Sequence, residues 1–176
     1  MFLPVHISRF GGVAIVALAI FGVLWSISRF LNKGVYFYFD PQDFVRAHPN
    51  ERIFPASASS ATFEPMLKHY IGVTQLLVTV AAASIAFGGG SQPLGAQIVT
   101  AKLFLAWTIF YGVLFCAMLL WRYDEYTQDM ESYTPFWYST VWALGFSTLS
   151  CFVIGYLAWG WGLSKLVSQK TSLVML

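Results

Sequence analysis

Charged residues are scarce in this sequence, and acidic ones are absent from its apolar stretches. Only 10% of the 176 residues are Asp, Glu, Lys or Arg, whereas soluble domains usually contain about 25%. No Asp or Glu falls inside any of the four long apolar runs, although proton relays and ion-coupled transporters normally need ionisable groups at membrane depth. The net charge of +2 comes without a cluster of Lys and Arg, which argues against a nucleic-acid surface. Composition therefore argues against an ion pump and a nucleic-acid partner.

Histidine and cysteine are also scarce, and neither occurs in a pattern that binds a cofactor. His6, His48 and His69 all lie outside the middle of an apolar run, so a haem held by two histidines from facing helices is not expected. Cys116 and Cys151 lie deep in apolar runs, whereas a disulfide framework needs cysteines in water-exposed loops. The sequence also lacks the spaced motifs of metal sites, nucleophile elbows and phosphate loops. We therefore expect no cofactor, no metal and no enzymatic activity.

Four long apolar runs dominate what is present. Hydrophobic residues make up 57% of the chain, and the mean hydropathy is +0.64. The runs cover approximately residues 10–27, 69–87, 98–121 and 136–163. About 20 apolar residues suffice to cross the hydrocarbon as a helix, and a backbone in lipid must satisfy its hydrogen bonds internally. We predict an all-α, multi-pass integral membrane protein, with residues 1–176 forming one domain of four transmembrane helices.

The first and last runs differ from the other two in ways that affect topology. The first is longer than the apolar core of most signal peptides and is followed by Ser28 and Arg29 rather than by a small-residue cleavage site, so we predict a retained span. The last run should begin with Thr134 as N-cap and Pro135 in the first turn. Because it exceeds the length needed to cross the hydrocarbon, it should tilt or project beyond the bilayer.

A polar connection of about 38 residues, 31–68, separates the first two runs. Asp40 and Asp43 flank Pro41 in the pattern of a helix start, so we expect a short helix there at the membrane surface. The stretch 55–61 shows no apolar period and is predicted to be a spacer. The second helix should then begin near Thr62 and end at the run of glycines that starts at Gly88.

An even number of spans places both termini on one side of the membrane and the polar connection on the other. All eight acidic residues lie on the side of the connection. The basic residues divide too evenly between the sides for the positive-inside rule to decide which is cytoplasmic. We expect the connection side to dock a soluble partner through a set of charged residues: Asp40, Asp43, Arg122, Asp124 and Glu125.

Small and polar side chains within the spans predict where helices pack together. In the second span Ala82 and Ala86 form one small-x-x-x-small pair, and Ser84 with Gly88 forms another. Gln75 and Thr79 extend this pattern as a polar strip, and we expect that face to be buried against another helix. Gln75 either forms a hydrogen bond across a helix interface or lines a pore.

The last two spans carry a second set of candidates for helix packing. Thr140 and Ser147 recur at helical spacing in the fourth span and predict a packing seam. The third span carries an aromatic stripe, which we interpret as a lipid or helix contact rather than a quinone or pigment site; its members are Phe104, Trp107, Tyr111 and Phe115.

These patterns favour a non-catalytic subunit of a membrane complex, which contacts membrane lipid and associates with other membrane subunits or with itself. We expect it in the bacterial inner membrane. The main alternative is an oligomeric channel or membrane-perturbing effector, in which Gln75, Thr79 and Thr140 face water. A further alternative is a lipid-modifying enzyme that uses His48 or His69 together with the acidic residues. The channel requires Gln75, Thr79 and Thr140 to line one path, whereas the enzyme requires a histidine and acidic side chains to lie close together.

Overall fold

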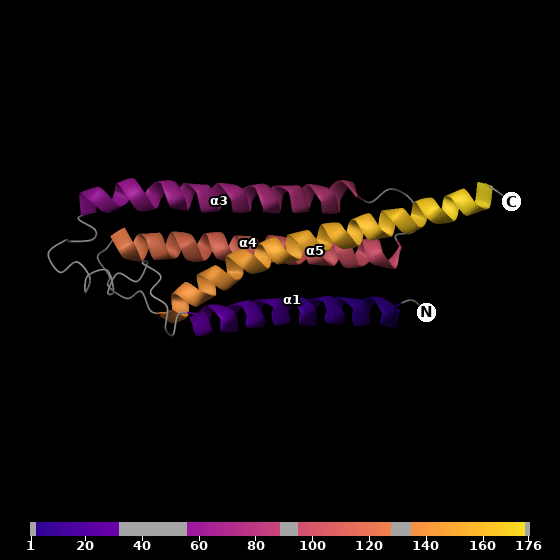
Figure 1. The fold of residues 1–176 in the computed structure, drawn as a ribbon, viewed down its shortest axis with the longest axis horizontal. Coiled ribbons are helices and arrows are strands. Elements are labelled where there is room, and N and C mark those ends of the chain that lie inside the picture. Colours follow the sequence, from indigo (N-terminus) through magenta and orange to yellow (C-terminus); the bar gives the residue numbers. More distant parts are fainter. Residues whose placement is uncertain (1–2, 32–55, 89–94, 128–134, 175–176) are drawn as a thin grey trace.

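The computed structural model contains four long α-helices, and it describes residues 3–31, 56–88, 95–127 and 135–174. The helices are α1 (Leu3–Leu31), α3 (Ala56–Phe87), α4 (Ala96–Thr127) and α5 (Pro135–Val174), as shown in Figure 1. Each contains a stretch long and apolar enough to cross a membrane: Arg9–Leu31, Leu67–Phe87, Ala96–Trp121 and Ser139–Lys165. For the described residues, the prediction of an all-α fold with four such helices is confirmed.

The ends of the helices follow the local sequence, with one clear difference from prediction. α3 ends at Phe87, directly before the glycines, and α5 begins at Pro135, both as predicted. α3 begins at Ala56 rather than near Thr62, so most of the predicted spacer is helical. Those added residues are alanines and serines without glycine or proline, and alanine has the highest helix propensity of any residue. Residues 32–55, including Asp40, Asp43 and the predicted surface helix, lie outside the described residues.

α5 is much longer than a membrane crossing requires. Its 40 residues correspond to about 60 Å at 1.5 Å per residue, whereas the hydrocarbon core is about 30 Å thick. The helix continues past the apolar stretch that ends at Lys165 and reaches Val174. In Figure 1 its C-terminal part extends beyond the other helices, at the end of the bundle where α1 begins. The length of this helix agrees with the prediction that it either tilts in the bilayer or projects beyond it.

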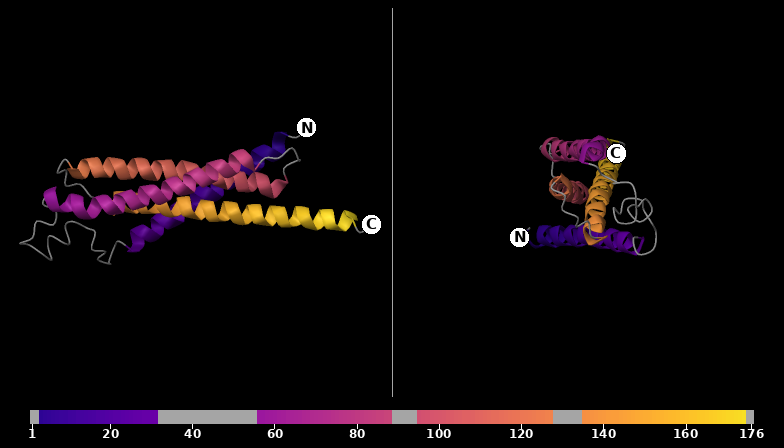
Figure 2. Two further views of the ribbon diagram at one scale, coloured as in Figure 1. Left: turned by 90° about the horizontal axis from the view of Figure 1, so that it is seen from above. Right: turned by 90° about the vertical axis from the view of Figure 1, so that its left-hand side faces the viewer.

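α4 and α5 form the centre of the bundle, and α1 and α3 lie on opposite sides of this pair (Figures 1 and 2). α4 and α5 each pack against all three other helices, whereas α1 and α3 do not contact each other within the described residues. The apolar windows of α4 and α5 are 33% and 39% buried, against 11% for α1 and for α3. The two outer helices therefore expose most of their apolar surface.

Glycines allow α3, α4 and α5 to approach closely. A Cβ atom at Gly112 of α4 would lie 2.5 Å from Val78 Cγ2 of α3 and 3.4 Å from Thr148 Cγ2 of α5. At Gly155 of α5, an added Cβ would lie 2.9 Å from Leu105 Cδ2 of α4. Small residues at helix contacts are the usual means of tight packing in lipid, where no hydrophobic effect drives the helices together.

Candidate functional site: the outward face of α3

Four of the predicted packing residues lie on the side of α3 that faces away from the rest of the chain. The side chains of Gln75, Thr79, Ala82 and Ala86 are all exposed. A different side of α3 packs on α4 and α5, and there Thr74 and Ala81 are buried. No described helix of this chain covers the outward face.

The exposed residues belong to a longer pattern that includes Gly72. Gly72 is exposed, and a Cβ atom added to it would meet nothing within 4 Å. The five residues follow one another at alternating steps of three and four, which is the spacing of a heptad contact line. We call this line the α3 seam, and its members are Gly72, Gln75, Thr79, Ala82 and Ala86. Gly72 was missed by the sequence analysis, which considered only small residues four apart.

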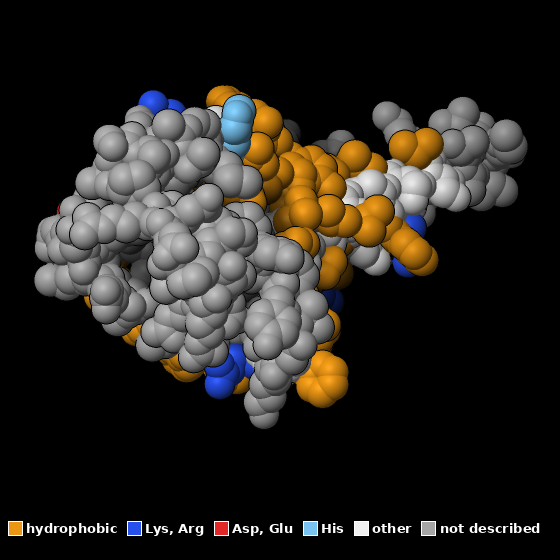
Figure 3. Space-filling model, turned by 60° about the vertical axis from the view of Figure 1, so that its left-hand side comes forward, with side chains coloured by type: hydrophobic (Ala, Val, Ile, Leu, Met, Phe, Trp, Pro, Cys, Tyr) orange, Lys and Arg blue, Asp and Glu red, His pale blue; other side chains and the backbone are white. Residues whose placement is uncertain are grey.

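The α3 seam differs from the exposed surface beside it. Three neighbouring exposed positions carry large apolar side chains, with exposed fractions of 60% for Val73, 63% for Leu76 and 87% for Phe87, whereas the exposed Ala83 is small. Large apolar side chains suit direct contact with lipid. The α3 seam has glycine, alanine, threonine and glutamine instead, which leave the helix backbone accessible to a neighbouring helix. Hydrophobic side chains also dominate the described part of the surface in Figure 3.

Gln75 is the polar centre of the α3 seam. It lies near the middle of the apolar stretch Leu67–Phe87, about 12 Å along the helix from Leu67 and about 18 Å from Phe87. No hydrogen bond joins its carboxamide to another described residue. An amide moved from water into an apolar environment without a partner costs roughly 2–7 kcal/mol, depending on the reference state. A hydrogen-bonding partner at this depth would therefore bind favourably.

The second predicted pair of small residues in α3 faces a different neighbour. The Ser84 hydroxyl shares a hydrogen bond with the Tyr156 hydroxyl of α5 and donates to the Val80 carbonyl at 2.8 Å. Gly88, at the end of α3, lies against the ring of Trp159. The two pairs therefore lie on two faces of α3. Ser84 and Gly88 face α5, whereas Ala82 and Ala86 lie on the exposed face.

The predicted residues of α5 lie elsewhere and do not join the α3 seam. Thr140 accepts a hydrogen bond from the Trp25 indole of α1 at 3.3 Å and donates to the Phe136 carbonyl at 2.9 Å. Ser147 is fully buried, and its Oγ has no hydrogen-bond partner within the described part of the chain. Thr140 therefore takes part in a contact between α1 and α5, whereas Gln75 and Thr79 lie on the outer side of α3.

The aromatic stripe of α4 is a helix contact. Phe104, Tyr111 and Phe115 are buried. The Tyr111 hydroxyl donates to the Ala17 carbonyl of α1 at 2.9 Å, and its ring stacks on Phe21 with centroids 6.0 Å apart. The interpretation of this stripe as packing is supported, and it fixes α1 to α4.

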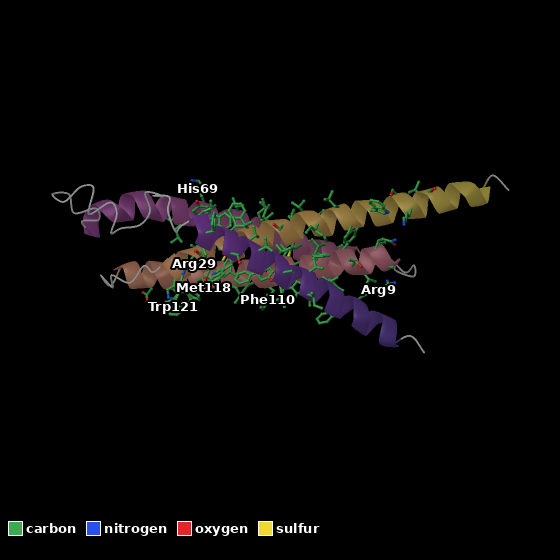
Figure 4. All side chains as sticks on the ribbon, turned by 60° about the horizontal axis from the view of Figure 1, so that its bottom comes forward. Arg9, Arg29, His69, Phe110, Met118 and Trp121 are labelled. Atoms are coloured by element: carbon green, nitrogen blue, oxygen red, sulfur yellow. The ribbon has the colours of Figure 1, made fainter. Side chains whose placement is uncertain are left out.

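The charged candidates lie at the ends of the helices. Asp124 is exposed near the C-terminal end of α4, whereas the side chains of Arg122 and Glu125 lie outside the described residues. Figure 4 shows Arg29, His69 and Trp121 toward one end of the bundle and Arg9 toward the other. No group of three or more His, Cys, Asp or Glu side chains gathers among the residues that were described. His48, required by the enzyme alternative, is not among them.

Comparison with known protein families, with curated proteins and with solved structures finds no match to this chain.

Proposed function

We propose that this protein is a non-catalytic subunit of a membrane complex, and that the α3 seam binds a helix of another polypeptide within the bilayer. Four apolar helices of sufficient length support the membrane location. In this arrangement both termini lie on one side of the bilayer, and the end of α4, which carries the exposed Asp124, lies on the other, where we expect a soluble partner to dock. The membrane that we propose is the bacterial inner membrane.

The position of Gln75 carries this proposal. Lipid offers no hydrogen-bond partner in the hydrocarbon, so an outward amide near the middle of a span is stabilised when a second helix supplies one. The residues around it are small enough to let that helix approach closely. None of the α3 seam residues ionises near neutral pH, and together they suit binding rather than acid–base chemistry.

The composition of the α3 seam favours helix packing over a water-filled path. A pore through an oligomer needs hydrophilic groups along its length. Here Gly72, Ala82 and Ala86 occupy three of the five positions, and Thr140 is in contact with α1. The channel alternative predicts a leak that depends on Gln75, so an ion-flux assay of Gln75→Leu in vesicles separates the two functions.

Extraction of the native complex in a mild detergent tests the proposal. We expect the wild-type protein to migrate well above the mass of one chain on native electrophoresis. Ala82→Leu, which places bulk in the α3 seam, should shift the protein towards the single chain. Val73→Leu enlarges an exposed residue beside the α3 seam and serves as the matched control. A single chain from native membranes, unaffected by either change, would defeat the proposal.

A further inference from the structure

We infer that the α3 seam binds the α3 helix of a second copy of this chain, with the two copies related by a two-fold axis along the bilayer normal. This inference rests on the proposed function, because it names the occupant of the same surface. Its basis is the hydrogen-bonding chemistry of Gln75 together with the outer position of α3.

A carboxamide can pair with a second carboxamide through two reciprocal hydrogen bonds. It carries an N–H donor and a carbonyl acceptor on the same planar group. Two copies inserted with the same topology bring their α3 helices together in parallel, and a two-fold axis places each seam residue opposite its own counterpart. The two Gln75 amides can then donate to each other reciprocally at one depth. A foreign helix would need an independent polar group at that depth, whereas a second copy supplies it by symmetry.

The spacing of the α3 seam fits such a pair along its length. A contact line at alternating steps of three and four is that of two parallel helices in a left-handed supercoil, and most membrane bundles have this geometry. From Gly72 to Ala86 the line covers about 21 Å of helix. Gly72, which precedes Gln75 along the helix, and Ala82, which follows it, would let the two backbones come close enough for the amides to meet.

The bundle leaves this face accessible. α3 contacts α4 and α5 through other residues, which include Thr74 and Ala81, and α1 lies on the far side of the α4 and α5 pair (Figure 2). Two copies can therefore approach through their α3 helices without moving another described helix of either bundle. Closed two-fold dimers are also the commonest form of homo-oligomer.

Disulfide formation between single introduced cysteines tests the inference in native membranes. Two differently tagged full-length copies are co-expressed with Ala82→Cys or Ala86→Cys in the α3 seam, and with Phe87→Cys as the control. Phe87 neighbours Ala86 in depth but lies outside the α3 seam and is 87% exposed. The wild-type chain, with Cys151 buried and Cys116 partly buried, provides the baseline. Because a disulfide requires Cα atoms within about 7 Å, only cysteines in the interface should react efficiently.

We expect the two seam variants to give a dimer that carries both tags, several-fold above the Phe87→Cys variant and the wild type. If a cysteine in the α3 seam instead forms a disulfide with a polypeptide of another mass, the inference is overturned and the proposed function still stands. If all three cysteine variants form disulfides only at the level of the wild type, and the protein is a single chain after extraction, both the inference and the proposed function are overturned.

A second measurement tests the paired amides directly. In lipid vesicles, energy transfer between labelled copies should show that Gln75→Leu weakens association by about 3- to 30-fold, the range expected for a hydrogen bond between helices in a membrane. Val73→Ala changes an exposed residue close to Gln75 in depth but outside the α3 seam, and it should leave association unchanged. An unaltered affinity for Gln75→Leu would overturn the arrangement.

Discussion

Replacing Gly112 with alanine should destabilise the bundle, because a methyl group at this position has no space where α3, α4 and α5 meet. The added Cβ would lie 2.5 Å from Val78 Cγ2, 3.3 Å from Thr74 Cγ2 and 3.4 Å from Thr148 Cγ2. The distance to Val78 Cγ2 is well below van der Waals contact, so either the Val78 side chain changes its rotamer or α3 and α4 move apart. Overpacking of this kind typically costs about 1–3 kcal/mol.

The intrinsic gain of helix propensity from glycine to alanine, up to about 1 kcal/mol, partly offsets this cost. Gly22→Ala of α1 provides the matched control, because an added Cβ there meets nothing within 4 Å. Both variants gain the same propensity, so the difference between them isolates the clash. We expect Gly112→Ala to be less stable than Gly22→Ala by about 1–3 kcal/mol.

The assay is equilibrium unfolding of the detergent-solubilised protein, followed by circular dichroism, with both variants in the same detergent. If Gly112→Ala unfolds at the same denaturant concentration as Gly22→Ala, then the three helices do not meet closely at this residue. The described junction would then be wrong.

Three further changes test the interior of the bundle by the same unfolding measurement. Tyr111→Phe removes the hydrogen bond to the Ala17 carbonyl and should lower stability by about 1 kcal/mol; an unchanged value would count against the contact between α4 and α1. Ser147→Ala removes a buried hydroxyl that has no partner among the described residues and should be neutral or stabilising, so a marked loss of stability would reveal a partner. Gly155→Ala should destabilise, because its Cβ would lie 2.9 Å from Leu105 Cδ2, whereas Gly160→Ala on the same helix meets nothing within 4 Å; equal effects would contradict the packing of α5 on α4.

The helices themselves could be predicted from the sequence because the physical requirement is simple. A backbone in hydrocarbon must form its own hydrogen bonds, so a long apolar run without acidic residues is expected to be a helix. Their ends were predictable where glycine or proline marks them, as at Gly88 and Pro135. The start of α3 was predicted incorrectly, because the alanines in the preceding stretch favour a helix without forming an apolar face.

Which side of each helix packs against its neighbours was harder to predict than where the helices lie in the sequence. The pair Ala82 and Ala86 and the pair Ser84 and Gly88 have the same spacing, and nothing in α3 alone distinguishes the face that meets α5 from the open face. That choice depends on Tyr156 and Trp159, which are far away in the sequence. The heptad line through Gly72 was present in the sequence, and a search for steps of three and four would have found it.

The central position of α4 and α5 has a consequence for biosynthesis. As the chain leaves the ribosome, α1 and α3 are made first, and neither has a described contact with the other. Neither can pack on another described helix until α4 is made, and α5, which touches all three, is the last of the four to be translated. Packing between the described helices therefore begins only when α4 is made, in the second half of the chain, and is completed by α5.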